Sequence, residues 1–183
     1  KDAFTNVKYR IDKNGVINVS MHYSGVSGIT YLPEFGVEIP VSKEFSYLSW
    51  YGLGPWENYI DRNNGCCLGV YEDSVSNQFT AYARPQECGN RTGVRWLTLS
   101  DKDGDTVTFE MDEYDFEFSY LPYSTAEINN ARHIDELNEG RSNTLKVLYK
   151  QMGVGGDDSW GAMVHDKYLM DATREIDWKF KIF

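Results

Sequence analysis

The sequence has few positive charges. Its 183 residues include 18 Lys and Arg against 28 Asp and Glu, which gives a formal net charge of −10. Nucleic-acid backbones and anionic membrane surfaces are both bound by clusters of Lys and Arg, and the sequence contains no such cluster. The charge balance therefore excludes a nucleic-acid partner and disfavours a membrane surface.

Long apolar runs are also absent. No run reaches the roughly 18 residues that a transmembrane helix needs, so the sequence predicts no membrane-spanning helix. The first four residues do not resemble a signal peptide, although a trimmed chain could have lost one.

Cysteine is scarce and odd in number: Cys66, Cys67 and Cys88. Adjacent cysteines rarely pair with each other, and there is no C-x-x-C spacing of the kind that binds zinc. We therefore predict free thiols, which weakly favours the cytoplasm over the periplasm without fixing the compartment.

Aromatic residues are abundant, at 15% of the chain with 13 Tyr and 5 Trp. This composition favours an all-β protein or a surface that binds ring-shaped ligands. The length suits one domain, residues 1–183, with a sizeable core.

Alternating and β-branched segments separated by turns predict a series of short strands. One helix is expected near residues 124–132, because Ser124 and Glu127 match the capping-box pattern. Short strands with a single helix indicate a β-sandwich or a barrel. The strands are expected at residues 4–11, 16–23, 36–41, 45–51, 66–71, 78–83, 94–99, 106–111, 116–121, 144–149, 168–170 and 175–183.

A glycine-rich segment at residues 152–161, with the sequence MGVGGDDSWG, interrupts this pattern. Glycines allow backbone angles that other residues avoid. We expect Asp157, Asp158 and Ser159 to bond nearby backbone amides and hold the loop in one shape. Such a loop could present Trp160, whose indole face suits the apolar face of a sugar ring. The alternative is that Trp160 is a core residue beneath a glycine turn.

A second polar loop places Arg84, Glu87, Asn90 and Arg91 within eight residues. An ion pair between Glu87 and one of the arginines would brace this loop. Planar polar groups of this kind also bind sugar hydroxyls in pairs. Both interpretations stay open at the level of the sequence.

The same residues suit other chemical roles less well. Asp157 and Asp158 are adjacent, so their side chains diverge and do not suit a glycosidase carboxyl pair. A metal site from these aspartates with His165 and Asp166 lacks a diagnostic spacing. An epimerase-like acid/base pair of His165 with Glu87 would need two distant loops to meet. The sequence contains no G-x-S-x-G motif for a hydrolytic triad.

Four motifs together resemble the large bacterial β-galactosidases of the family-two glycoside hydrolases. Residues 51–62 (YGLGPWENYIDR) are similar to the family's GxGPxENYPDR, and residues 84–92 (RPQECGNRT) to its RPQENGNRT. Residues 121–124 (LPYS) and 152–160 (MGVGGDDSW) match its LPYS and MGVGGDDSW, and the order is the same. Ile60 and Cys88 replace the family's usual Pro and Asn.

The resemblance implies the C-terminal, small-chain type domain of such an enzyme, a large antiparallel β-sandwich related to galactose mutarotase. In the family, two glutamates in a separate central barrel carry out retaining hydrolysis of terminal β-galactosides. The resemblance therefore implies no catalytic residue here, and it assigns to Trp160 the tryptophan that stacks on the sugar at the active-site mouth. It implies no cofactor or metal in this chain, since the Mg²⁺ or Na⁺ of the family lies in the barrel domain.

The family's C-terminal domain is longer than 183 residues. We expect its first strands to be absent, which would leave sheet edges open to other domains of the same polypeptide or to a second copy of the chain. The alternatives to the β-galactosidase assignment are a standalone carbohydrate-binding module and an aldose 1-epimerase-like enzyme.

Overall fold

The computed structural model describes residues 3–111, 113–158 and 160–183. Thirteen strands and short helical turns make up the regular structure of this part of the chain. The strands are β1 (Thr5–Ile11), β2 (Ile17–Tyr23), β3 (Tyr31–Leu32), β4 (Glu34–Ser42), β5 (Tyr47–Gly54), β6 (Cys67–Ser74), β7 (Arg91–Val94), β8 (Trp96–Ser100), β9 (Thr106–Glu110), β10 (Phe116–Leu121), β11 (Ser142–Gln151), β12 (Met170–Asp171) and β13 (Ile176–Ile182). The helical elements are α1 (Thr125–Asn130), η1 (Val75–Asn77), η2 (Ile134–Glu136) and η3 (Asp166–Tyr168).

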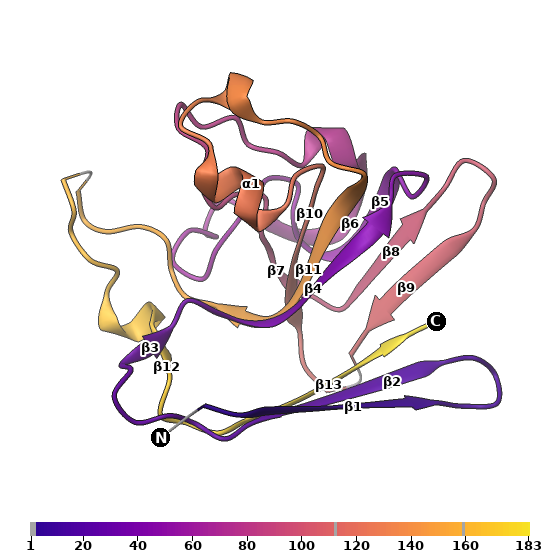
Figure 1. Cartoon of the computed structure of the whole chain (residues 1–183), viewed down its shortest axis with the longest axis horizontal. Helices are drawn as coiled ribbons and strands as arrows, with labels where there is room; N and C mark the ends of the chain where they lie inside the picture. The colour runs from indigo at the N-terminus through magenta and orange to yellow at the C-terminus, as the bar shows by residue number, and fades with distance from the viewer. Residues whose placement is uncertain (1–2, 112, 159) are drawn as a thin grey trace.

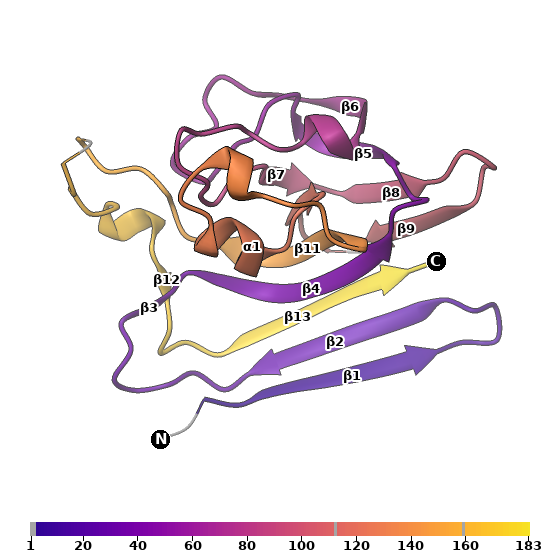
Figure 2. The same ribbon diagram turned by 45° about the horizontal axis from the view of Figure 1, so that its top comes forward.

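Two antiparallel sheets pack face to face (Figures 1 and 2). The larger has seven strands in the order β1-β2-β13-β9-β8-β5-β6, and the smaller has the order β4-β11-β10-β7. A two-stranded pair, β12-β3, lies at one end. The prediction of an all-β antiparallel sandwich with one short helix is confirmed.

Alternation along the strands builds the core between the sheets. Successive side chains of a strand face opposite sides, so every second residue turns inward. Leu48 and Trp50 of β5 and Leu97 and Leu99 of β8 are buried in this way. They belong to one apolar cluster that also takes in Phe118 of β10.

The helix α1 begins where the sequence predicts. The Ser124 side chain accepts the Glu127 N–H at 3.2 Å, and the Glu127 carboxylate accepts the Ser124 N–H at 2.7 Å, which completes the capping box. Figure 2 shows α1 on the side of the smaller sheet that faces away from β13. Within the described residues, none of the helices is long and apolar enough to span a membrane.

A second, smaller apolar cluster lies around α1. Ile128 of the helix packs with Cys88 and with Leu121 of β10. All six residues of β10 are therefore buried, because the core covers one face of this strand and the second cluster covers part of the other.

The strand β1 differs from the half-buried strand that its alternation predicts. Every residue of β1 is exposed. Val7, Tyr9 and Ile11 pair with Met21, Val19 and Ile17 of β2, so they lie on the core side of the sheet. They remain exposed because β1 is the edge strand, beyond the part of the larger sheet that the smaller sheet covers.

Two further sequence expectations need correction. Residues 78–83 do not form a strand; the 3₁₀ turn η1 precedes them, and the segment is irregular. Gln78 is instead buried with its amide between polar groups, and its Nε2 donates to Asp73 at 2.7 Å. The second polar loop, expected at residues 84–92 and called the arginine loop below, also ends earlier than expected, because Arg91 and Thr92 already belong to β7.

Candidate functional site

The glycine loop, residues 152–165, leaves β11 and projects away from both sheets (Figure 1). Trp160 is 92% exposed, so the interpretation of Trp160 as a core residue is wrong. Gly161 follows with φ +111°, a backbone conformation that favours glycine. The loop thus presents the indole to solvent.

The acidic residues of the glycine loop have different partners. Asp158 Oδ1 accepts the N–H groups of Trp160 at 2.8 Å and Ala162 at 3.2 Å, as expected of a residue that caps backbone amides. Among the described residues, Asp157 caps no backbone amide, and its Oδ1 lies 2.8 Å from Nε2 of His165. Ser159 lies outside the described residues. Asp158 therefore fixes the backbone on both sides of the indole.

A second loop, residues 55–65, lies against the glycine loop. Asp61 of this loop accepts the Gly155 N–H through Oδ2 at 2.7 Å. Neither Asp61 nor Glu57 was among the residues predicted from the sequence. The available signal was the pair of acids in WENYID, directly after the glycine and proline of residues 52–55.

Glu57 joins three segments of the chain. Its carboxylate pairs with Arg62 at 2.6 Å, accepts Thr80 Oγ1 and Gly89 N–H at 2.8 Å each, and also accepts the Tyr82 hydroxyl. Burial raises the pKa of Glu57, but these hydrogen bonds and the Arg62 charge outweigh burial and hold the pKa below its usual value. The charged form is therefore stabilised and braces the loop of residues 55–65 against Thr80, Tyr82 and Gly89.

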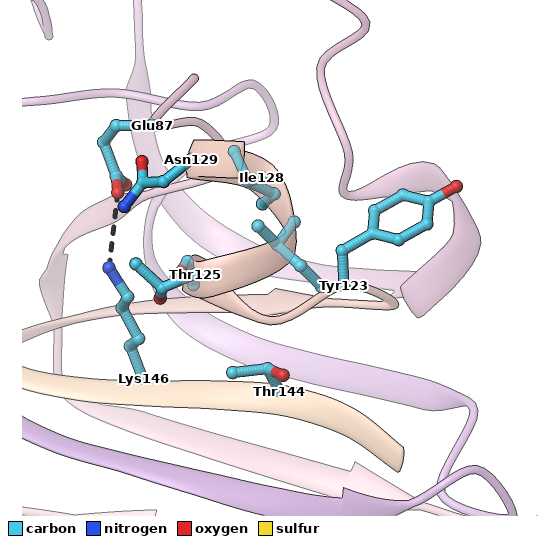
Figure 3. Close-up of a pocket in the computed structure, with 9 residues that line it drawn as sticks. Glu87, Tyr123, Thr125, Ile128, Asn129, Thr144 and Lys146 are labelled. Atoms are coloured by element: carbon cyan, nitrogen blue, oxygen red, sulfur yellow. Dashed lines mark hydrogen bonds and ion pairs between the residues drawn. The ribbon is translucent and has the colours of Figure 1, made fainter. Parts of the chain in front are cut away.

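The expected pair between Glu87 and an arginine is wrong. Glu87 lies 3.3 Å from Lys146 of β11, and the same ammonium group lies 2.9 Å from Glu34 (Figure 3). Arg84 is exposed to solvent. An ion pair nonetheless braces the arginine loop, but its cation is Lys146, 59 residues from Glu87 in the sequence. No local sequence pattern can indicate a pair so far apart.

Asn90 and Arg91 are buried and act as a support for the loops. Asn90 Nδ2 donates to Glu117 at 2.9 Å, and Arg91 donates to the Gly89 carbonyl at 3.0 Å and to Gln78 at 3.0 Å. Neither side chain is available to a ligand at the surface. Their position favours the bracing interpretation over direct contact with sugar hydroxyls.

Two hollows in the structure lie away from Trp160. The one beside Glu87, Lys146 and α1 has a volume of about 20 Å³, about enough for one water molecule. The other, about 1050 Å³, lies over β1, β2 and β13. None of the described residues of the glycine loop lines either hollow, and Trp160 faces open solvent.

The comparisons with known proteins agree with one another. Residues 1–182 match the family model described as "Beta galactosidase small chain". A β-galactosidase of Streptococcus thermophilus is 44% identical over 99% of this chain, and one of Lactobacillus delbrueckii subsp. bulgaricus is 42% identical over 92%. A β-galactosidase small subunit of Latilactobacillus sakei is 34% identical over 96% of this chain.

These relatives are named β-galactosidases, which are glycoside hydrolases. The chain belongs to the β-galactosidase small chain family. It spans 18% and 16% of the length of the first two β-galactosidases and 58% of the small subunit.

Proposed function

We propose that this chain is the C-terminal part of a β-galactosidase and that it places Trp160 at the mouth of the active site. Membership of the family and the exposed indole support this proposal. The reaction is the retaining hydrolysis of terminal β-galactosides. The two glutamates that carry it out belong to another domain, so this chain is inactive alone.

The role of Trp160 is to bind the sugar by stacking. An indole held on a rigid loop loses little side-chain entropy when a ligand binds. Favourable aromatic pairs contribute about 0.5–1.5 kcal/mol beyond the area that they bury, and a contact of this size changes affinity by a few-fold. This is too little for strong binding by the isolated chain, since association itself costs several kcal/mol.

The acids around the loop are occupied in ways that suit support and do not suit catalysis. Asp158 and Asp61 accept backbone amides, and Asp157 pairs with His165. Across the described part of the chain, no three His, Cys, Asp or Glu side chains gather so as to hold a metal ion. The proposal leaves the Mg²⁺ or Na⁺ of the family to the barrel domain, as the resemblance implies.

Other domains of the same polypeptide are the partners that we propose for β1. Val7, Tyr9 and Ile11, on the core side of the larger sheet, are 39%, 65% and 68% exposed. An apolar strip on an edge strand of this kind is covered in a stable protein. A second copy of the chain is the alternative occupant.

Two other functions are less well supported. An epimerase would need Glu87 and His165 in one cleft, but Glu87 pairs with Lys146 and His165 pairs with Asp157. Polarimetry of the purified chain with fresh α-galactose tests this activity directly. A standalone binding module predicts measurable galactoside binding by the chain, which titration calorimetry would detect.

The deciding experiment is Trp160→Ala in the full-length enzyme. We expect the KM for a galactoside to rise about three- to tenfold, the loss of one stacking contact, with a smaller change in kcat. Tyr114→Ala, at an exposed aromatic between β9 and β10, is the control and should leave KM unchanged. Unchanged kinetics of Trp160→Ala would refute the stacking role.

A further inference from the structure

We propose that Asp61 is a positioning residue that holds the glycine loop where Trp160 meets the substrate. The inference rests on the proposed function for its kinetic consequence, but its structural part stands on contacts alone. Asp61 and Gly155 are 94 residues apart in the sequence, and Asp61 Oδ2 accepts the Gly155 N–H at 2.7 Å. This contact joins the loop that carries the indole to the loop of residues 55–65.

Asp61 binds the glycine loop at Gly155, further along the loop than its base. The base is already fixed by backbone bonds from Met152 N–H to the Pro33 carbonyl and from Gly153 N–H to the Tyr168 carbonyl, both at 2.9 Å. The bond to Asp61 comes two residues later, on the way to Trp160. A loop fixed only at its base can swing as a unit, and a contact further along limits that motion.

The glycines allow the two loops to approach closely. A Cβ added to Gly153 would lie 2.7 Å from both Cγ and Oδ2 of Asp61, closer than real side chains pack. The carboxylate therefore touches the loop at Gly153 as well as at Gly155. Two contacts, one by packing and one by a hydrogen bond, set both the distance and the direction of the loop.

Asp61 is itself held in place. Tyr59 and Arg62 form a tight turn around it, with the Arg62 N–H donating to the Tyr59 carbonyl at 2.8 Å. Arg62 then pairs with Glu57 at 2.6 Å, and the Glu57 side chain is only 11% exposed. Arg62 therefore links the turn that contains Asp61 to Glu57, a mostly buried carboxylate with several hydrogen bonds.

The two oxygens of Asp61 differ in their contacts. Oδ1 is buried and accepts no hydrogen bond from the described residues. The contacts with the glycine loop are made by Oδ2, which accepts the Gly155 N–H at 2.7 Å, together with Cγ.

The test combines hydrogen exchange and kinetics in the full-length enzyme. Asp61→Ala removes the acceptor, whereas Asp61→Asn keeps an oxygen that can accept the Gly155 N–H. Asp101→Ala is the matched control, because Asp101 Oδ1 accepts the N–H groups of Asp103 and Asp105, at 2.9 Å each, in the distant turn between β8 and β9. Amide exchange is read by mass spectrometry on peptides that cover residues 152–162, and the KM for a galactoside is measured in parallel.

We expect Asp61→Ala to speed exchange in this peptide at least about tenfold, the lower end of the factor that corresponds to losing a hydrogen bond to a charged group. Asp61→Asn should restore most of the protection, and Asp101→Ala should leave it unchanged. Unchanged exchange in Asp61→Ala, or equal effects of Ala and Asn, would overturn the anchoring role.

The kinetic half uses a double-mutant cycle with Trp160→Ala. Because Asp61 acts through Trp160, we expect Asp61→Ala to raise KM in the native background and to add little once Trp160 is absent. Additive effects would show that Asp61 does not act through the indole. If Trp160→Ala leaves KM unchanged while Asp61→Ala still speeds exchange, the stacking role in the proposed function is wrong and the anchoring stands.

Discussion

The ammonium group of Lys146 lies between two carboxylates, 2.9 Å from Glu34 and 3.3 Å from Glu87. Burial raises the pKa of Glu87 in spite of this cation, and Glu34 raises it further. The Lys146 side chain is buried. Through Glu34 it joins β11 to β4, and through Glu87 it joins β11 to the arginine loop.

Lys146→Met is expected to destabilise the protein by about 2 kcal/mol. Breaking a fully buried pair costs roughly 3–5 kcal/mol, but the Glu34 and Glu87 side chains are 31% and 32% exposed and water screens part of the loss. The measurement is the urea midpoint at pH 7. Lys150→Met, at an exposed position on the same strand, should change stability by less than about 0.5 kcal/mol; similar losses in the two variants would contradict the prediction.

Glu117 makes stability depend on pH. Burial raises its pKa to about 7 from 4.5, although hydrogen bonds from Asn90 and the Gln151 N–H oppose the rise. The folded state then holds the Glu117 proton more tightly than the unfolded state does. The resulting stability is complete below about pH 4.5 and is lost as pH rises to about 7.

Glu117→Gln should remove this loss, because the amide stays neutral and can still accept both hydrogen bonds. At 1.36 kcal/mol per pH unit, the variant is expected to be more stable than the native protein at pH 8 by at most about 3 kcal/mol, and equal to it near pH 4.5. Unfolding curves from pH 4.5 to 8 give the difference. Glu175→Gln, at an exposed residue, is the control, and a parallel pH profile for Glu117→Gln and the native protein would refute the argument.

The three free thiols should differ sharply in reactivity. Burial raises the pKa of Cys88 to about 12, so at pH 8 about one thiol in 10,000 is ionised. Cys67 is exposed, and Cys66 is partly buried. We expect iodoacetamide to modify Cys67 first and Cys88 only after unfolding in urea, as followed by mass spectrometry; early modification of Cys88 would contradict its burial.

Gly153→Ala tests the close approach of the two loops. The new methyl group would meet Asp61 at 2.7 Å, and forced overpacking costs about 1–3 kcal/mol. In the full-length enzyme we expect the loop to shift and KM to rise several-fold. Gly65→Ala adds the same methyl group where nothing lies within 4 Å and should have no effect. A tolerated Gly153→Ala would mean that the contact does not hold the loop.

Tyr9→Ser tests whether other domains cover β1. Tyr9 is exposed in this chain, so the change should cost less than about 0.5 kcal/mol here. In the full-length enzyme a covered Tyr9 would cost about 1–3 kcal/mol, which thermal unfolding would register. Lys8→Ser, whose side chain points to the opposite face, is the control. Equal stability of the two variants in the full-length enzyme would show that no other domain covers Tyr9 of β1.

Local patterns determined much of the fold. The strand bounds of β10 follow its apolar run, and α1 begins at Ser124 because a capping box involves residues only three apart. The order of four motifs was sufficient to indicate the family, and the match of residues 1–182 to the family model confirms it. These features depend on residues close together in the sequence or on their order alone.

Residues 78–83 show where such reasoning ends. Their apolar and polar residues suggest a strand, but they pair with no described strand of either sheet. The side chains of Phe79 and Tyr82 instead pack beside the small cluster around Ile128. Strand formation requires a partner, and a single segment does not contain that information.

The sequence by itself determined most of the strands, the helix cap, the family and the presence of a glycine-rich loop that carries Trp160. Only the tertiary structure decided that Asp61 meets Gly155 and that Lys146 meets Glu87. It also decided that the apolar face of β1 lies uncovered. The physical reason is that a turn or a cap is built from neighbouring residues, whereas these contacts depend on which strands and loops the whole fold brings together.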